Sequence, residues 1–274
     1  YRTGKTKCFY LAVVFGMLSF YSYSPAQMVV AVTAILLLLS DWKIHKQNWK
    51  IVLLGVGLGL ILAIPYFRFL ILHPGENKRH LEIVNSYWIQ AVPFIEKLKI
   101  YFSTYIELLD PRYWFIPNTV DLERHVMREY GHLIRWSLPI FLLGLGITVK
   151  RIKDGNYRLL LIALLAAPSG AALATAGITR TLFMVIPAAL ITALGFEQVF
   201  LWIERLKVPR SLIAGITFLG LGFANFFILN DALTNGPTWY SNYSLNGQQY
   251  GAKQIFTEIH SMLEEDPNQS IYFS

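Results

Sequence analysis

The sequence predicts an all-α polytopic membrane protein with about seven transmembrane helices, a long external loop and the start of an external α/β domain. Three observations lead to this prediction. Of the 274 residues, 54% are hydrophobic and only 15% are charged, whereas soluble domains carry about 25% charged residues. The mean hydropathy is +0.43. The apolar residues fall in long blocks that are separated by basic segments.

The remaining composition excludes several other classes. The single cysteine, Cys8, excludes a disulfide framework and a cysteine-ligated zinc site. The sequence contains no Gly-rich phosphate loop and no nucleophile elbow, which argues against a nucleotide-driven pump. The chain begins at Tyr1 without a signal-peptide pattern, so we interpret it as a fragment whose upstream part is missing.

Seven apolar stretches reach or approach the roughly 20 residues that a helix needs to cross a bilayer. They run approximately over residues 8–21, 26–39, 51–72, 133–149, 159–176, 181–203 and 211–229. The first two are short and are joined by residues 22–25, which allows either a tight helical hairpin or one long broken helix. We favour the hairpin, because lysines lie at both outer ends. The membrane domain then comprises three spans in residues 1–72 and four in residues 133–230.

Lysine and arginine in the short connecting segments set the orientation. The segments 1–7, 41–50, 150–158 and 204–210 hold 13 Lys and Arg against three acidic residues, so we place them in the cytoplasm. The loop 73–132, with 7 basic and 8 acidic residues, and the acidic tail 231–274 then lie outside. Seven spans satisfy this alternation at every loop. The basic pI is thus explained by anchoring, and nucleic-acid binding is not needed.

Both external segments carry a pattern of their own. Residues 89–109 form an amphipathic stretch suited to the membrane interface. In the tail, residues 252–263 predict an amphipathic helix, Asp266-Pro267-Asn268 ends it, and residues 271–273 predict a strand. This order of helix, turn and strand predicts the opening of a truncated external domain.

Three arginines lie at the external ends of predicted spans, where the positive-inside rule does not require them: Arg68, Arg135 and Arg180. Charged residues within spans are expensive and are functional candidates. Together these arginines could bind an anion, because the guanidinium offers bidentate hydrogen bonds to phosphate. The alternative is that each one only extends to the interface. Glu197, toward the cytoplasmic end of its span, receives no role.

The densest polar run of the chain extends from Asp121 to His132. Its two histidines, His125 and His132, would share one face of a helix. Zinc sites on helices use closer spacing, so we predict no metal site and no cofactor, and leave a divalent cation open. The alternative interpretation of the run is a solvated helix that leads into the fourth span.

Four passages with short motifs follow one another along the chain. They are Gly16–Pro25 (GMLSFYSYSP), Tyr105–Phe115 (YIELLDPRYWF) followed by Arg124-His125, Gly131 and Leu138-Pro139, Ala166–Pro187 with Thr179-Arg180, and Tyr250–Lys253 (YGAK). In this order they resemble the later half of the integral-membrane glycosyltransferases of GT-C type, in particular bacterial relatives of protein O-mannosyltransferases and of lipid A aminoarabinose transferases. The resemblance covers most of the chain.

The resemblance implies transfer of a sugar from a polyprenyl-phosphate donor to an unidentified acceptor at the external face of the bacterial inner membrane. Membrane lipids and the donor are the expected partners. The catalytic base is implied in a first external loop, upstream of Tyr1. Cations stabilise the leaving phosphate. The resemblance assigns the phosphate or carrier to Arg124, His125, Arg180, Arg68 and Arg135, and the acceptor or sugar groove to Asp110, Arg112, Tyr113 and Trp114.

Two other functions fit the same pattern. The first is a secondary transporter or flippase of an anionic or lipid-linked substrate. Transporters favour charges near the midplane and internal repeats, whereas these charges lie at the rim and we find no repeat. The second is a scaffold that binds lipid-linked intermediates without catalysis.

Overall fold

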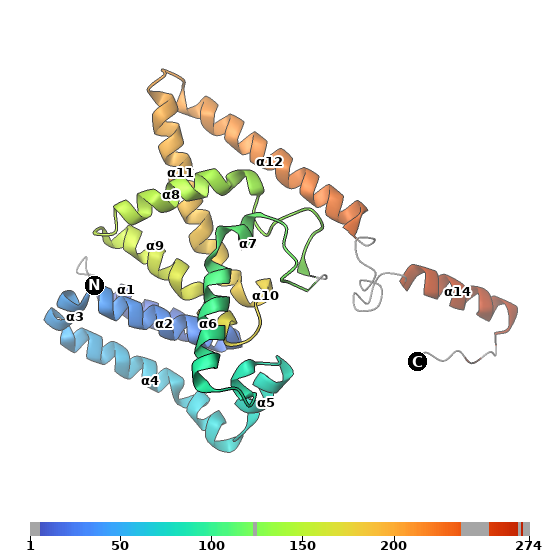
Figure 1. Ribbon diagram of the computed structural model, residues 1–274, viewed down its shortest axis with the longest axis horizontal. Helices are drawn as coiled ribbons and strands as arrows, with labels where there is room; N and C mark the ends of the chain where they lie inside the picture. The colour runs from blue at the N-terminus through green and yellow to red at the C-terminus, as the bar shows by residue number, and fades with distance from the viewer. Residues whose placement is uncertain (1–5, 123–124, 237–251, 268–269, 271–274) are drawn as a thin grey trace.

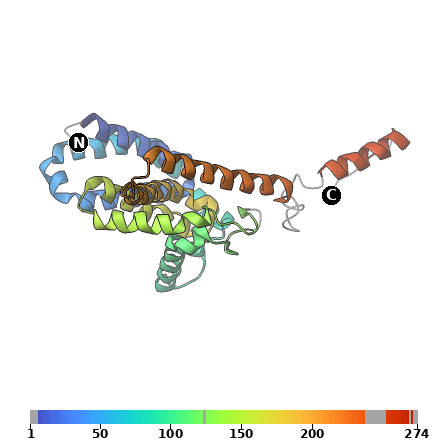
Figure 2. The ribbon, with the colours of Figure 1, turned by 90° about the horizontal axis from the view of Figure 1, so that it is seen from above.

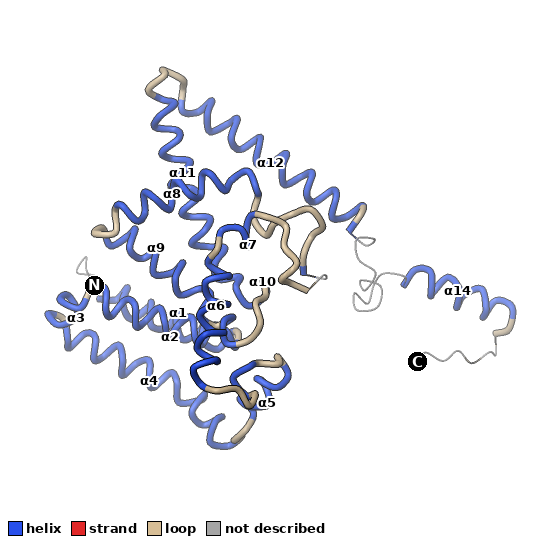
Figure 3. The backbone as a smooth tube through the Cα atoms, in the orientation of Figure 1, coloured by secondary structure: helices blue, strands red, loops and turns tan. Residues whose placement is uncertain are grey.

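The computed structural model describes residues 6–122, 125–236, 252–267 and 270, and every regular element within these ranges is helical (Figure 3). The first helices are α1 (Thr6–Ser22), α2 (Ser24–Ser40), α3 (Trp42–Gln47), α4 (Trp49–Leu72) and α5 (Glu76–Ile83). The loop that follows contains α6 (Phe94–Leu109) and α7 (Pro111–Phe115). The last are α8 (Leu138–Lys150), α9 (Gly155–Ala166), α10 (Ile178–Thr181), α11 (Val185–Glu204), α12 (Arg210–Thr234) and α14 (Ala252–Glu265).

Four helical segments are long and apolar enough to cross a membrane: Trp49–Leu72, Gly155–Leu173, Ile178–Glu204 and Arg210–Thr234. They indicate a membrane protein. The other three predicted spans are shorter, since α1 and α2 have 17 residues each and α8 has 13. α8 begins at Leu138 instead of the expected Leu133, because Pro139 suits the first turn of a helix.

The first two helices form the predicted hairpin. Only Tyr23, in extended backbone, separates α1 from α2. A β-carbon at Gly16 would lie 3.9 Å from Val30 Cγ1, and these two residues are equally far from Tyr23 along the chain. The two helices therefore run antiparallel, and the hairpin interpretation is confirmed.

α8 and α11 cross as a close helix pair (Figure 1). A β-carbon at Gly144 would collide with the carbonyl oxygen of Ile191, and one at Gly195 with that of Ile140. Small residues at such crossings let two backbones approach closely. The buried core adjoins this pair and includes Leu108, Trp114, Phe115, Phe141, Met184 and Ile191.

The predicted span 159–176 is not one continuous helix. After Ala166 it continues as two 3₁₀ turns, η4 (Ala167–Ser169) and η5 (Ala171–Leu173), around Pro168 and Gly170. Carbonyl groups at such a break lose their helical partners. Hydroxyl groups from the loop 73–132 replace these partners: Ser86, Tyr87, Tyr101 and Tyr105 donate to the carbonyl oxygens of Leu173, Ala172, Ser169 and Leu165, respectively. Most of the predicted amphipathic stretch 89–109 forms α6, and this helix packs on η4 and η5.

The surface of the outer helices is strongly apolar. Only Gly55 of α4 and Ile213 of α12 are buried, and Phe218 of α12 is 74% exposed. α12 contacts α11 near their connection and then diverges from it (Figure 1 and Figure 2). Exposed apolar faces of this extent suit lipid contact. In the tail, α14 confirms the predicted amphipathic helix, while the predicted strand at 271–273 lies outside the described residues.

Candidate functional site

A buried carboxylate, Asp121, lies in the later part of the loop 73–132. The side chain of Asp121 has no exposed surface. Its Oδ1 atom accepts the hydroxyl of Tyr113 at 3.1 Å and the backbone N–H of Ile178 at 2.6 Å, and its Oδ2 atom lies 2.9 Å from Nε2 of His132. A buried charge is tolerated only with such partners. Three separate chain segments therefore meet at Asp121.

These partners keep Asp121 ionised at neutral pH. Burial raises the pKa of the carboxyl group, but hydrogen bonds from His132, the Ile178 N–H and Tyr113 outweigh burial and leave that pKa below its ordinary value. Burial and the charge of Asp121 raise the pKa of Tyr113, so its hydroxyl stays a donor. Because an ionised carboxylate only accepts, Nε2 of His132 must carry a proton.

The loop around Asp121 is shaped by local and distant backbone contacts. Asp110 caps α7, since its Oδ1 atom accepts the backbone N–H of Arg112 at 2.8 Å. Asn118 Oδ1 accepts the backbone N–H of Asp121 at 3.3 Å. On the returning side of the loop, a β-carbon at Gly131 would lie only 2.6 Å from the carbonyl carbon of Phe115. The position therefore requires glycine, and the two sides of the loop run together.

Arg180 lies in α10, two residues after Ile178. Its Nη1 atom donates to the carbonyl oxygen and to the hydroxyl oxygen of Thr175, both at 3.0 Å. The side chain is partly exposed, and no carboxylate of the described residues lies within ion-pair distance of it. A guanidinium has five N–H groups. Those on Nε and Nη2 have no partner within the described part of the chain, so one edge of the guanidinium is open.

The other predicted cationic residues lie apart. Arg68 is exposed near the end of α4, and Arg135 is exposed in η3 (Arg135–Ser137) before α8. The end of α4 lies beside α5, whereas the start of α8 lies beside α7 (Figure 1). No hydrogen bond among the described residues joins these arginines to Arg180. Arg124 lies outside the described residues.

The predicted helix through the polar run is absent from its described part. His125 lies in a turn, where its backbone N–H donates to the Leu122 carbonyl at 2.7 Å, and residues 126–134 form turns and extended backbone. His125 and His132 therefore do not share a helix face, and the solvated-helix alternative is wrong as well. Among the described residues, no group of three or more His, Cys, Asp or Glu could hold a metal ion.

The four residues assigned to an acceptor groove divide into two pairs. Arg112 Nη2 lies 2.6 Å from Asp110 Oδ2, and the Arg112 side chain is 80% exposed. The hydrogen bonds from Arg112 lower the pKa of Asp110. Tyr113 and Trp114 are only 4% and 3% exposed, and the Trp114 indole donates to the Leu108 carbonyl at 2.7 Å. Both rings are buried in the core. The predicted acceptor or sugar groove would require exposed ring faces, so the structure does not bear out this role for Tyr113 and Trp114.

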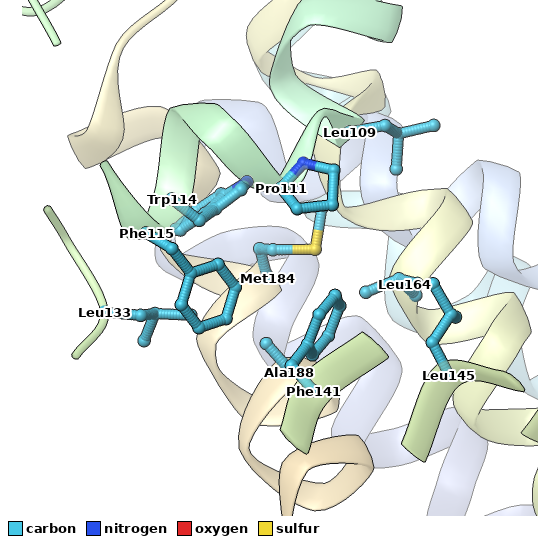
Figure 4. Close-up of a pocket in the computed structure, with 10 residues that line it drawn as sticks. All are labelled: Leu109, Pro111, Trp114, Phe115, Leu133, Phe141, Leu145, Leu164, Met184 and Ala188. Atoms are coloured by element: carbon cyan, nitrogen blue, oxygen red, sulfur yellow. The ribbon is translucent and has the colours of Figure 1, made fainter. Parts of the chain in front are cut away.

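Beneath α7 lies a cavity of about 90 Å³ (Figure 4). Trp114, Phe115, Phe141 and Met184 point into it, together with other apolar residues from α6, α7, α8, α9, α11 and the loop before α8. Such a lining offers no hydrogen bonds to sugar hydroxyls, because the indole N–H of Trp114 is already bonded to Leu108. This apolar cavity therefore does not suit a sugar.

Sequence reasoning singled out Arg180 but missed Asp121 as an anchor. The available signal was an aspartate inside the densest polar run with a histidine eleven residues later. Its third partner, the Ile178 N–H, lies 57 residues away and leaves no trace in a local pattern. A search of protein families, of curated proteins and of solved structures finds no match to this chain.

Proposed function

We propose that the protein is a GT-C-type glycosyltransferase of the bacterial inner membrane that transfers a sugar from a polyprenyl-phosphate donor to an acceptor at the external face. The observation that carries this proposal is Arg180. It lies at the end of an apolar helix, half-buried, with an open guanidinium edge and no acidic partner among the described residues. An arginine at that depth favours an anion as its partner.

The chemistry of such a transfer matches the way Arg180 is held. As the acceptor hydroxyl attacks the anomeric carbon, the bond to the lipid phosphate breaks and negative charge develops on the phosphate. A cation that is already oriented stabilises this charge without further reorganisation. The two bonds from Nη1 to Thr175 fix the guanidinium, and the free edge can form a bidentate pair with phosphate oxygens.

Contacts between distant loops support the seven-span arrangement with two distinct sides. Arg158 Nη2 lies 2.6 Å from Asp41 Oδ1, which joins two segments that we place in the cytoplasm. The Tyr130 hydroxyl donates to Asp231 Oδ2 at 2.8 Å, which joins the external loop to the end of α12. Arg180 falls on the second side. The proposed donor therefore reaches it from the external leaflet.

Asp121 is not a candidate for the catalytic base. Its carboxylate is fully buried and all of its partners are donors from the protein. A general base must reach the proton that it removes, and Asp121 touches no open space.

One observation favours the alternative of a transporter or flippase. The break at η4 and η5 interrupts an apolar helix, and transporters use broken helices to coordinate ions with freed carbonyl groups. In this chain, however, the carbonyls of Leu165, Ser169, Ala172 and Leu173 already accept hydroxyl groups from the external loop. These carbonyl groups already have hydrogen-bond donors within the protein, which argues against an ion site at this break, and we favour sugar transfer.

The test uses the purified full-length protein in lipid vesicles with a labelled polyprenyl-phosphate sugar as donor and a bacterial membrane extract as the source of acceptors. The proposal predicts that label enters the acceptor fraction and that polyprenyl phosphate is released in equal amount. Movement of the donor across the vesicle membrane without transfer would establish the alternative. Donor binding with neither transfer nor movement would identify a scaffold.

A further inference from the structure

We propose that Asp121 is a positioning residue: it fixes the backbone segment on which Arg180 rests, and thereby the orientation in which Arg180 meets a lipid-linked phosphate. This inference rests on the proposed function and names how its phosphate contact is built. It differs from an electrostatic role, because no ion pair joins Asp121 to Arg180; the effect passes through the backbone.

The first step is the anchoring of α10. Ile178 is the first residue of α10, and Gly177 before it has no side chain that could cap the helix. The first N–H groups of a helix need an acceptor from elsewhere. Asp121 Oδ1 supplies it at 2.6 Å. A carboxylate from the external loop therefore does the work that a local capping residue normally does.

The second step leads from this backbone to the guanidinium. The N–H of Arg180 donates to the Gly177 carbonyl at 3.0 Å. Its Nη1 atom bonds twice to Thr175 and would lie 3.6 Å from a β-carbon at Gly177. The guanidinium is thus positioned by residues 175–177, which directly precede Ile178, the residue whose N–H binds Asp121. If this segment shifts, the open edge of Arg180 turns with it.

The third step concerns the rigidity of the anchor. Tyr113, on α7, and His132, on the returning side of the loop, both bind Asp121. Thr181, on α10, is fully buried and donates to the Gly177 carbonyl at 3.0 Å. Every group that touches the carboxylate is itself packed in the core or beside it. The anchor is therefore held from three segments, which is what an accurate phosphate contact needs.

The experiment measures the affinity of the full chain in lipid nanodiscs for a polyprenyl phosphate, and for the uncharged polyprenol as a probe of the lipid tail alone. We expect Arg180→Ala and Asp121→Ala each to weaken binding of the phosphate by about tenfold, the loss of one charge-assisted contact. Polyprenol binding stays unchanged in both. The double variant binds no more weakly than Arg180→Ala alone, because Asp121 acts through Arg180.

A matched control comes from the opposite end of the bundle. Asp154 caps α9, since its Oδ1 atom accepts the backbone N–H of Asn156 at 2.9 Å. Asp154→Ala removes a capping carboxylate from another apolar helix, and we expect unchanged affinity for the polyprenyl phosphate. If Asp121→Ala does not fold, Asp121→Asn decides the question. Asparagine keeps the shape of the side chain and one acceptor oxygen, so we expect the affinity for the polyprenyl phosphate to fall about threefold. This loss should be absent in the Arg180→Ala background.

The outcomes separate this inference from the function on which it rests. Unchanged affinity in a folded Asp121→Ala or Asp121→Asn variant, beside a loss in Arg180→Ala, overturns the positioning role and leaves the phosphate contact intact. Equal losses from the Asp121 change with and without Arg180 identify a general structural role, which also overturns it. Unchanged affinity in Arg180→Ala removes the phosphate contact and with it both proposals.

Discussion

The carboxylate of Asp121 accepts the backbone N–H of Ile178 at 2.6 Å across 57 residues of chain. This hydrogen bond joins the loop 73–132 to the first turn of α10. Because the carboxylate also binds Tyr113 and His132, the loop and the helix start behave as one unit. The stability of the loop and the geometry at Arg180 therefore depend on the same group.

Acid should weaken this junction. The pKa of Asp121 in the folded protein lies below its ordinary value, which is about 3.9 in unfolded chains. A lowered carboxyl pKa contributes stability that is fully present above the unfolded pKa and is lost as the pH falls through the folded pKa. Measured in detergent, the midpoint temperature of thermal unfolding should decrease as the pH is lowered below about 4. It should decrease less in Asp121→Asn than in the wild type. An equal acid response in the variant and the wild type would contradict this.

The crossing of α8 and α11 predicts a sharp contrast between two glycines of one helix. A β-carbon at Gly144 would collide with the Ile191 carbonyl oxygen, whereas one at Gly146 meets nothing within 4 Å. Gly144→Ala should lower the free energy of unfolding by about 1–3 kcal/mol through overpacking. Gly146→Ala, the matched control, should be neutral or stabilise by up to about 1 kcal/mol. Equal effects on thermal unfolding would refute the close crossing.

The hydroxyl groups that bind the broken helix should contribute individually. Tyr105→Phe removes the donor to the Leu165 carbonyl and should lower the free energy of unfolding by about 0.5–1.5 kcal/mol. Tyr101→Phe should lower it less, because its oxygen lies 3.3 Å from the Ser169 carbonyl oxygen. Thermal unfolding of the two variants under one condition provides the comparison. A larger loss for Tyr101→Phe would argue against this account of the break.

Because α8 has only 13 residues, a labelling experiment can test directly whether it crosses the membrane. Asn77 lies in the loop 73–132, which we place outside, and Asn156 lies in a segment that we place in the cytoplasm. Only the predicted span 133–149 separates the two segments. In a Cys8→Ser background, a membrane-impermeant thiol reagent should label Asn77→Cys in intact spheroplasts, and Asn156→Cys only after permeabilisation. Labelling of both from the same side would show that α8 does not cross.

The apolar helices could be predicted from the sequence because lipid leaves a chain few choices. A spanning backbone must satisfy its own hydrogen bonds, so an apolar block becomes a helix, and α4, α11 and α12 follow the predicted ranges closely. The break after Ala166 was missed although Pro168 and Gly170 signal it. Hydroxyl groups far away in sequence, including those of two tyrosines of α6, donate to the carbonyl groups at this break.

The site was predictable only in part. The position of Arg180 at a span end follows from hydropathy and charge alone. The surroundings of Asp121 do not, because the loop folds through contacts between distant segments, such as Gly131 against Phe115. Helical periodicity suggested that His125 and His132 share a face. The side chain of Asn118 instead accepts backbone N–H groups and turns the chain. Such side-chain hydrogen bonds compete with the backbone hydrogen bonds of a helix.

The most direct test of the central claim is the rate of sugar transfer from a labelled polyprenyl-phosphate donor by Arg180→Ala, beside Arg79→Ala as matched control. Arg79 is an exposed arginine of the loop 73–132 that pairs with Glu76 on the surface of α5. The account predicts a loss of about 10²–10³ in transfer rate for Arg180→Ala, typical of removing one group that stabilises developing charge, and wild-type transfer for Arg79→Ala. Transfer at the wild-type rate by Arg180→Ala would contradict it.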